Sequence, residues 1–500
     1  MKVDSWLKIT PEDGYDYELL KPKLTVNNPE YLTRKKMGFK TTELQVQGKC
    51  PNCGKEVHET YQKRKDIPKE CKRCLSPVKY LIDEVEMRRK DPLYKEVGNE
   101  LWVPRALVHN YQGNNKLEDN TTMGDREVDF KSKIQLGPNE HTAMDQNHFV
   151  DELTKSLQNG YGAIGQSLAG SGKTVMALEV ISRLKRPTAV LVHKEFLMNQ
   201  WAERVMDFYN IKKEDVGFVQ QDVCEYSNKK IVIIMIQSLL AREYPKSLFD
   251  YFGTICIDEV HRVAATEFRK SIVLFPARYR FGVTATPRRQ DNLENVFFWH
   301  VGDIAVVGEQ QGLKPEVKVV KTNVTPTTME RNRFYDFRGK QNLNKVTDYL
   351  INSSQRNKLI VSLLVKALKA NRKVLLLSGR LAHLENLKNM LELQMIKEGI
   401  RHTTGYYIGG MKEEERTISA TRQCIFGTFA MAQEALDIQD LDSLFLTTPK
   451  SDIEQSTGRI LRLMEGKKKP IVIDFSDEIE ICIAMLKKRV NMYKDLGYMK

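Results

Sequence analysis

The stretch SLAGSGKTVMALEVISRL, residues 167 to 184, determines how we interpret the rest of the chain. Its first half is rich in glycine, and its second half has the apolar spacing of an amphipathic helix. Glycines let backbone N–H groups converge on a phosphate without side-chain clash, and the N-terminus of the following helix favours negative charge. The residues Gly170, Ser171, Gly172, Lys173 and Thr174 are therefore predicted to form a phosphate-binding loop.

In a loop of this kind the lysine contacts the β- and γ-phosphates, and the threonine hydroxyl binds Mg²⁺. Lys173 and Thr174 are the candidates for these roles, which imply ATP and Mg²⁺ as ligands. Ser167 occupies a position that more often holds glycine or alanine. The alternative is a chance Gly-Ser-Gly turn at the start of a helix.

An acidic pair lies downstream in CIDEVH, residues 256 to 261, at the end of an apolar run typical of a buried strand. Phosphoryl transfer needs one carboxylate that holds the metal ion and another that orients or deprotonates the attacking water. Asp258 and Glu259 are predicted to fill these roles, and His261 is a further catalytic candidate. A strand that ends in two solvated acids is the alternative.

A pair of arginines follows much later, in QSTGRILR at residues 455 to 462. Arg459 and Arg462 are three residues apart, so on a helix they share a face. A guanidinium beside the γ-phosphate stabilises the charge of the transition state. We expect hydrolysis to depend on two domains closing around the nucleotide. A surface charge pair is the alternative.

The texture of the chain changes near residue 145. Residues before it are polar and irregular, whereas short β-branched runs such as 188–192 and 254–257 then alternate with helical patterns. This alternation indicates βαβ units and parallel sheets, so we predict an α/β fold with two sheets in tandem. The predicted parts are an N-terminal accessory domain (1–140), a first α/β domain (141–308), a connecting segment (309–345), a second α/β domain (346–480) and a helical tail (481–500).

The composition favours a polyanionic partner. Lysine and arginine number 78 against 65 acidic residues, which gives a net charge of +13. Such an excess suits nucleic acid, although basic clusters are also common on solvated faces. The chain has no long apolar run, and its start carries acids where a signal peptide needs an apolar core. We expect a cytoplasmic protein without a membrane partner.

Four of the eight cysteines form two C-x₂-C pairs, Cys50 with Cys53 and Cys71 with Cys74. Two such pairs supply four thiolates for a tetrahedral Zn²⁺, with no open position for catalysis. We therefore predict a structural zinc module at about residues 45–80. A redox dithiol, an iron–sulfur cluster and an unmetallated set of thiols are the alternatives. Basic residues beside the ligands leave two roles open, nucleic-acid contact and docking.

These motifs, in this order, resemble the superfamily 2 helicases of the DEVH type over about residues 142–475. SLAGSGKT, CIDEVH and QSTGRILR resemble their motifs I, II and VI. The remaining matches are PTAVLVHKEFLMNQW at 187–201, MIQSL at 235–239, GVTATPRR at 282–289, LLLSGRLAHLENL at 375–387 and FGTFAMAQEALDI at 426–438.

The resemblance implies two RecA-like domains with ATP between them, and it assigns further residues. Gln146 would contact adenine, since an amide can pair with that base, although an exposed helical glutamine is the alternative. Thr284 and Thr286 would couple hydrolysis to movement. Asp437 and Gln455 are further nucleotide-site candidates, and the nucleic-acid candidates are Gln237, Ser238, Arg380, Gly427 and Thr428.

Motif details narrow the resemblance. The chain has DEVH, TAT and a glutamine-led motif VI, unlike the DEAD-box RNA helicases, and its motif Ia and IV regions resemble XPB and the phage recombination helicase UvsW. This subgroup implies an ATP-dependent DNA helicase that acts on forks and junctions, with recombination or replication proteins as partners. The alternatives are a double-strand translocase, an ATP-gated clamp and an RNA helicase. Segment 326–345, including Phe334, is a candidate strand-separating wedge, with a linker or core role as the alternative.

Overall fold

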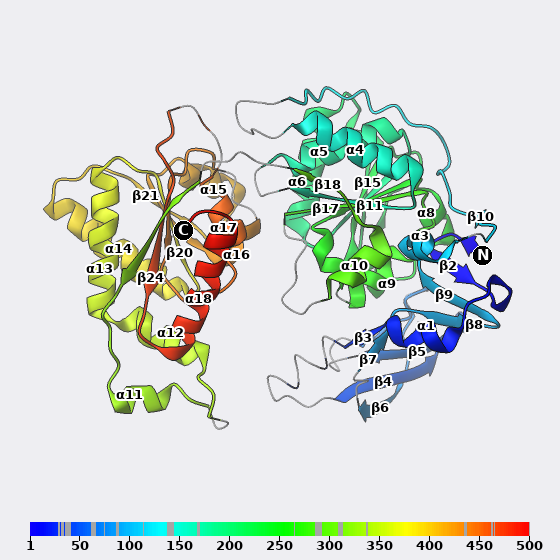
Figure 1. The fold of residues 1–500 in the computed structure, drawn as a ribbon, viewed down its shortest axis with the longest axis horizontal. Helices are drawn as coiled ribbons and strands as arrows, with labels where there is room; N and C mark the ends of the chain where they lie inside the picture. The colour runs from blue at the N-terminus through cyan, green and yellow to red at the C-terminus, as the bar shows by residue number, and fades with distance from the viewer. Residues whose placement is uncertain are drawn as a thin grey trace. The chain divides into compact units, whose positions relative to one another are not determined.

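The structure is a computed structural model in which the chain forms two compact units. Of the described residues, those within 1–137, 145–167 and 172–308 belong to the first unit, and Ser171 and those from 314 on belong to the second. Each unit is described by itself, with the elements labelled as in Figure 1. The described residues are 1–28, 31, 35, 42–61, 67–74, 76–86, 90–113, 115–137, 145–167, 171–264, 266–285, 293–308, 314–336, 339–434, 438–461, 464 and 466–499.

The first unit is built around an eight-stranded sheet of order β14-β13-β15-β12-β16-β17-β11-β18. All neighbours pair in parallel except β13 with β14. Strands β12 and β15 are buried at every position, as expected for β-branched runs covered by helices on both faces. The strands are β11 (Ala163–Ser167), β12 (Thr188–Val192), β13 (Val216–Gln220), β14 (Val223–Cys224), β15 (Ile231–Met235), β16 (Thr254–Asp258), β17 (Tyr279–Thr284) and β18 (Ile304–Gly308).

Helices connect these strands and cover the sheet (Figure 1). The helices of this part are α4 (Gln146–Asn159), α5 (Lys173–Leu184), α6 (Glu195–Phe208), α7 (Ile236–Ala241), α8 (Lys246–Asp250), α9 (Thr266–Ile272) and α10 (Glu294–Val301), with short 3₁₀ helices η4 (Lys213–Asp215) and η5 (Val260–Ala264).

The N-terminal residues are more regular than their composition suggests. They form a five-stranded sheet of order β10-β1-β2-β9-β8, a three-stranded sheet β5-β4-β6 and a pair β3-β7. The strands are β1 (Lys2–Val3), β2 (Trp6–Ile9), β3 (Thr25–Asn27), β4 (Thr42–Lys49), β5 (Glu56–Tyr61), β6 (Leu81–Glu86), β7 (Lys90–Pro92), β8 (Lys95–Val97), β9 (Glu100–Pro104) and β10 (Glu118–Asp119); α1 (Tyr17–Lys23) and α3 (Val108–Tyr111) accompany them. Most of these strands are too short to give a clear alternating pattern in the sequence.

A buried arginine fastens this N-terminal part to the larger sheet. Arg105 is 1% exposed, and its guanidinium donates to the carbonyls of Ala277 (2.6 Å) and Tyr161 (2.8 Å). Hydrogen bonds from a buried guanidinium to backbone carbonyls resist separation, because an unpaired buried charge is costly. The N-terminal part therefore belongs to the first unit.

The second unit has a six-stranded, wholly parallel sheet of order β19-β24-β23-β20-β22-β21. Alternate residues of β20 enter two separate hydrophobic clusters, which shows that helices cover both faces. The elements are β19 (Glu316–Lys321), α11 (Thr328–Arg333), α12 (Leu343–Asn352), α13 (Ser354–Lys369), β20 (Val374–Ser378), α14 (Leu381–Lys397), β21 (Thr404–Tyr407), α15 (Glu413–Ala420), β22 (Cys424–Thr428), α16 (Phe429–Glu434), β23 (Ser443–Leu446), α17 (Glu454–Gly458), β24 (Ile471–Ser476) and α18 (Glu480–Asp495). The predicted α/β fold with two parallel sheets in tandem is confirmed.

Much of the expected connecting segment 309–345 lies within this second unit. Strand β19 pairs with β24 along its whole length. Phe334 is only 3% exposed, and its ring packs against Tyr349 with centroids 5.2 Å apart. The proposal of Phe334 as a wedge that stacks on bases is therefore wrong, because the side chain is part of the core.

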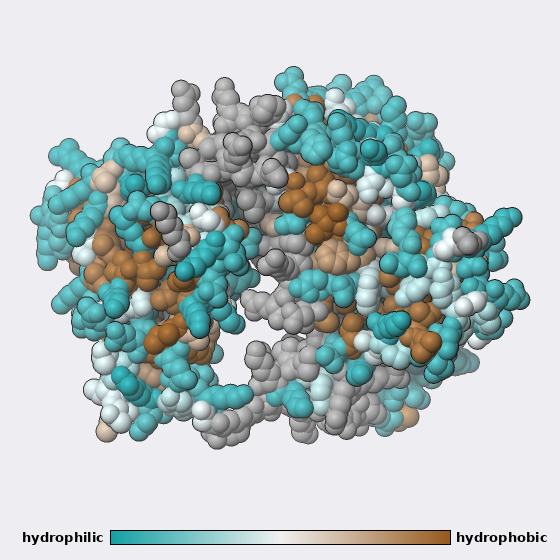
Figure 2. Space-filling view, viewed as in Figure 1, coloured by the Kyte–Doolittle hydropathy of each residue, from teal (hydrophilic) through white to brown (hydrophobic). Residues whose placement is uncertain are grey.

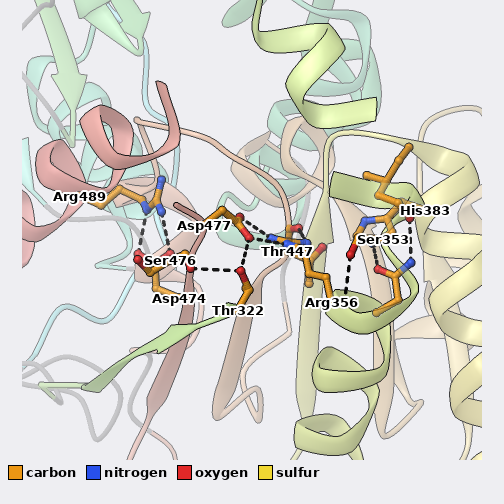
Figure 3. Close-up of polar contacts among 11 residues, drawn as sticks. Thr322, Ser353, Arg356, His383, Thr447, Asp474, Ser476, Asp477 and Arg489 are labelled. Atoms are coloured by element: carbon orange, nitrogen blue, oxygen red, sulfur yellow. Dashed lines mark hydrogen bonds and ion pairs between the residues drawn. The ribbon is translucent and has the colours of Figure 1, made fainter. Parts of the chain in front are cut away.

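A buried polar network holds the second unit together, as Figure 3 shows. Arg356 donates to both carboxylate oxygens of Asp477, at 2.8 and 3.0 Å, and to the carbonyl of Thr447 at 2.7 Å. Arg489 of α18 makes a second two-fold contact with Asp474, at 2.8 Å for each oxygen. Helices α13 and α18 are thereby joined to strand β24 and its C-terminal end.

The surface in Figure 2 is mostly hydrophilic, with hydrophobic patches on each unit. None of the described helices combines the length and apolar character that a membrane-spanning segment needs.

Candidate nucleotide site and cysteine cluster

The motifs of the first unit meet at one edge of its sheet. Thr284 is in register with Gln166, and Val283 with Asp258. Ile257, next to Asp258, is in register with Leu191, so the end of β12 lies at the same height in the sheet. Since all these strands are parallel, the segments that follow them emerge at the same edge, where α/β sheets bind ligands.

The glycine-rich loop leads into α5 at this edge. Gly172 has a φ of +85°, a left-handed conformation that suits glycine. Ser171 is fully buried, while Lys173 and Thr174 form the first turn of the helix. Gly170 lies outside the described residues.

Gln146, at the start of α4, lies against the loop. Its side chain is 3% exposed, which excludes the exposed helical glutamine weighed above. A Cβ atom at Gly172 would lie 2.8 Å from Gln146 Nε2, so no larger residue fits there without displacing the amide. The predicted adenine-contact residue and the phosphate loop are thus brought together.

Asp258 is held by a residue from another motif. Trp201 Nε1 in α6 donates to Asp258 Oδ2 at 3.0 Å. Burial and the neighbouring Glu259 charge raise the pKa of the Asp258 carboxyl, while Lys173 acts against them. A carboxyl whose pKa is perturbed by burial and by a second acid is a functional-site candidate, and a bound metal ion would favour its ionised form.

Glu259 has an unusual backbone. Its φ is +52°, a conformation that L side chains rarely adopt and that clusters at functional sites. Although burial acts in the opposite direction, His261 and the charge of Lys173 lower the pKa of Glu259. The carboxylate therefore stays ionised beside the phosphate loop.

His261 links the acidic segment to the end of β17. Its Nδ1 lies 2.9 Å from Thr284 Oγ1 and 3.3 Å from Glu259 Oε2. A Cβ atom at Gly282 would lie 2.4 Å from the Cβ of Val260, so the strand approaches η5 as closely as glycine allows. Thr286 lies outside the described residues.

In the second unit, the candidate residues also gather at one sheet edge. Thr428 is in register with Ser378, and Gly427 with Leu377. Arg380 follows this edge, and its guanidinium donates to Asp348 (3.0 Å) and Asn344 (2.9 Å) of α12.

The arginine segment lies beside α16. Arg459 Nε donates to the carbonyl of Ala432 at 2.8 Å. Gln455 lies in α17, but its side chain is outside the described part of the chain, as are Arg462 and Asp437.

Comparisons with known proteins identify the family of this chain. Residues 140–289 match the family model of the type III restriction enzyme res subunit. A protein of Acanthamoeba polyphaga mimivirus, named as an ATP-dependent RNA helicase, is 34% identical over 396 residues, which cover 77% of this chain and 72% of the viral protein. The chain belongs to the superfamily 2 helicases.

Two further relatives are more distant. A protein of Escherichia phage T5, named as a helicase, is 25% identical over 66% of this chain and 71% of its own length. The solved structure of T4 UvsW matches 82% of this chain and 88% of its own at 14% identity, with a TM-score of 0.33. Family membership makes this chain an ATP-hydrolysing helicase with nucleic acid as its substrate class.

Two predicted nucleic-acid contacts of the helicase lie on α7. Gln237 is exposed, and its Nε2 donates to the carbonyl of His193 at 2.9 Å. Ser238 is 4% exposed, and its hydroxyl accepts from the backbone N–H of Gln221 at 2.9 Å. Of the two, only Gln237 has an exposed side chain.

The four predicted metal ligands of the helicase form one cluster, in which all Sγ atoms lie within 4.8 Å of one another. The Cys50–Cys74 and Cys53–Cys71 sulfur distances are 3.5 and 3.6 Å. Four sulfurs at about 2.3 Å from Zn²⁺ stand about 3.8 Å apart, so the cluster fits this ion closely. Hydrogen bonds from Ser76 lower the pKa of Cys74 to about 6, whereas, against a hydrogen bond from Lys55, burial and the neighbouring cysteines raise the pKa of Cys53, so the thiols titrate as one group.

Backbone turns shape the two cysteine pairs. The amide of Gly54 donates to the carbonyl of Cys50 at 3.0 Å, and Gly54 has a φ of +70°. Gly54 thus forms the turn after the first pair, and the cluster could bind zinc.

Trp201 is the functional residue that we did not single out from the sequence. It lies in the quoted motif Ia string, but the chain separates it from Asp258 by 57 positions. Only the packing of α6 against the sheet edge reveals this hydrogen bond.

Proposed function

We propose that this helicase acts on DNA and unwinds or branch-migrates forked and junction substrates. ATP-driven motor activity is supported by the position of the phosphate loop, Asp258, Glu259 and Thr284, which lie at the same edge of the sheet. The DEVH form, the glutamine-led motif VI and the XPB- and UvsW-like strings support DNA. The net charge of +13 suits either nucleic acid.

We propose the following roles at the nucleotide site. Lys173 neutralises the β- and γ-phosphates, and Thr174 and Asp258 hold Mg²⁺, with Trp201 orienting the carboxylate. A Mg²⁺ ion held by these residues would supply positive charge against the charge that develops on the phosphates. Glu259, kept ionised, orients or accepts a proton from the attacking water.

Coupling would pass through His261. Its contact with Thr284 joins the hydrolytic segment to the strand that precedes Thr286. A change in the position of Glu259 would therefore shift His261 and, through it, Thr284 at the end of β17. The roles in the second unit remain predictions: contact with the γ-phosphate for Arg459 and Arg462, and nucleotide binding for Asp437 and Gln455.

An RNA helicase is the second candidate, because the mimivirus relative is named as one. A double-strand translocase and an ATP-gated clamp remain alternatives. The Cys₄ cluster is proposed to hold a structural zinc ion, since its four ligands leave no open position.

Strand release from a labelled DNA fork tests the proposal. A four-way junction, a plain duplex and an RNA fork run beside it, with Lys173→Ala as the hydrolysis-deficient control. We expect release from forks and junctions that disappears in the variant. Preference for the RNA fork would replace DNA by RNA, and DNA-stimulated hydrolysis without release would indicate a translocase.

A further inference from the structure

A lysine beside each cysteine pair contacts the same residue of the first unit, Glu243. Lys55, two positions after Cys53, forms an ion pair with the carboxylate of Glu243. Lys72, between Cys71 and Cys74, accepts a hydrogen bond on its carbonyl from the Glu243 backbone N–H at 3.1 Å. Glu243 therefore meets the cysteine cluster through its side chain and its backbone at once.

Glu243 follows α7 directly, and α7 carries Gln237. The amide of Arg242 donates to the carbonyl of Ser238 at 3.0 Å, which ties the segment before Glu243 to the helix. The side chain of Gln237 donates to the carbonyl of His193. His193 follows β12, the neighbour of β16, which ends in Asp258. A continuous series of contacts thus runs from the cysteine cluster to the sheet edge that carries Asp258 and the phosphate loop.

We infer that Glu243 is a positioning residue through which the metal-loaded cysteine module holds α7 in the conformation that binds nucleic acid. The inference rests on the proposed function, since it takes Gln237 as a nucleic-acid contact and the cluster as a zinc site. A metal held by all four cysteines fixes both pairs relative to each other. Loss of the metal frees each pair, so the two contacts with Glu243 no longer act together.

The Glu243–Lys55 pair is partly exposed, with 33% and 34% of the side chains accessible. Such pairs change an equilibrium by about two- to fivefold, so Glu243→Gln should raise the Kd for nucleic acid by that factor. Glu243→Asp keeps the charge and should restore most of the affinity. Glu56→Gln is the matched control, because the ion pair of Glu56, with Lys49 at 3.5 Å, lies within the module.

The experiment measures the fluorescence anisotropy of a labelled single-stranded oligonucleotide with the full-length protein. Zinc-loaded, chelator-stripped and zinc-restored samples are compared, and zinc content is measured for each. Amide hydrogen exchange over residues 236–245 reports the helix directly, independently of activity. We expect stripping to raise both the Kd and the exchange in this segment, and zinc restoration to reverse both.

Three outcomes separate the inference from the function on which it rests. A higher Kd for Gln237→Ala, Glu243→Gln and the stripped protein, with Glu56→Gln unchanged, supports the inference. A higher Kd for Gln237→Ala alone, with unchanged exchange after stripping, overturns it and leaves the proposed contact intact. An unchanged Kd for Gln237→Ala removes the contact itself, and with it the inference.

Discussion

Replacing Arg356 by methionine should destabilise the second unit selectively. The guanidinium is 1% exposed and makes three hydrogen bonds, two of them to Asp477. In Arg356→Met, the 3% exposed carboxylate of Asp477 keeps one contact, the hydroxyl of Thr322 at 2.8 Å. Removing one partner of a buried ion pair costs about 3–5 kcal/mol, because the other charge is left uncompensated.

The distribution of tryptophan provides the assay. All four tryptophans, Trp6, Trp102, Trp201 and Trp299, belong to the first unit. Tryptophan fluorescence therefore follows only that unit, whereas far-ultraviolet circular dichroism follows both. With a urea m-value of about 2 kcal/mol/M, the expected loss moves the second-unit midpoint down by about 1.5–2.5 M. The fluorescence midpoint should stay where it is.

A control and a double variant complete the test. Arg380→Met removes an exposed pair with Asp348, so it should cost less than about 1 kcal/mol. Arg356→Met combined with Asp477→Leu should recover part of the lost stability, because neither charge of this pair is then left buried without its partner. A loss below about 1 kcal/mol for Arg356→Met, or an equal shift in fluorescence, would refute the reasoning.

Three further predictions concern single positions. Trp201→Phe removes the donor to Asp258, so the Mg²⁺ concentration for half-maximal ATPase should rise about tenfold, and an unchanged Mg²⁺ titration would count against this role. In Gly282→Ala, the added methyl group should push Val260 and η5 away from β17, which should lower kcat and leave KM for ATP unchanged. A wild-type kcat would show that η5 can shift without affecting hydrolysis. Burial, and then Arg356, lower the pKa of His383 to about 3, so the folded state resists its protonation. The neutral imidazole of His383 therefore contributes its full stabilisation above pH 6.5, and this contribution decreases as the pH falls toward 3, by about 2 kcal/mol at pH 5. Equal urea midpoints at pH 7.5 and pH 5, measured by circular dichroism, would contradict the predicted loss of stability at low pH.

The sequence predicted the elements whose signals are local. The apolar run at 188–192 coincides with β12, and the run at 254–257 with most of β16, because buried parallel strands are continuous in β-branched residues. The spacing of the two cysteine pairs likewise predicted that the four sulfurs form one cluster. The order of strands within each sheet was not accessible, since it depends on pairings between distant segments.

Features set by packing were missed for the same reason. Nothing in the sequence pairs Trp201 with Asp258 or Glu243 with the cysteine module. The N-terminal sheet also escaped notice, since strands as short as Lys2–Val3 leave no periodicity. Phe334 looked like an aromatic beside basic residues on a linker, and only its burial under α12 and α18 shows that it serves the core.

The left-handed backbone of Glu259 has a consequence for how this protein can evolve. A non-glycine residue at a φ of +52° costs stability that glycine at the same place would not. Selection for a robust fold and selection for turnover therefore pull this position in opposite directions. Screens that reward only thermal tolerance should drift toward glycine here and yield hardier proteins that have lost their turnover.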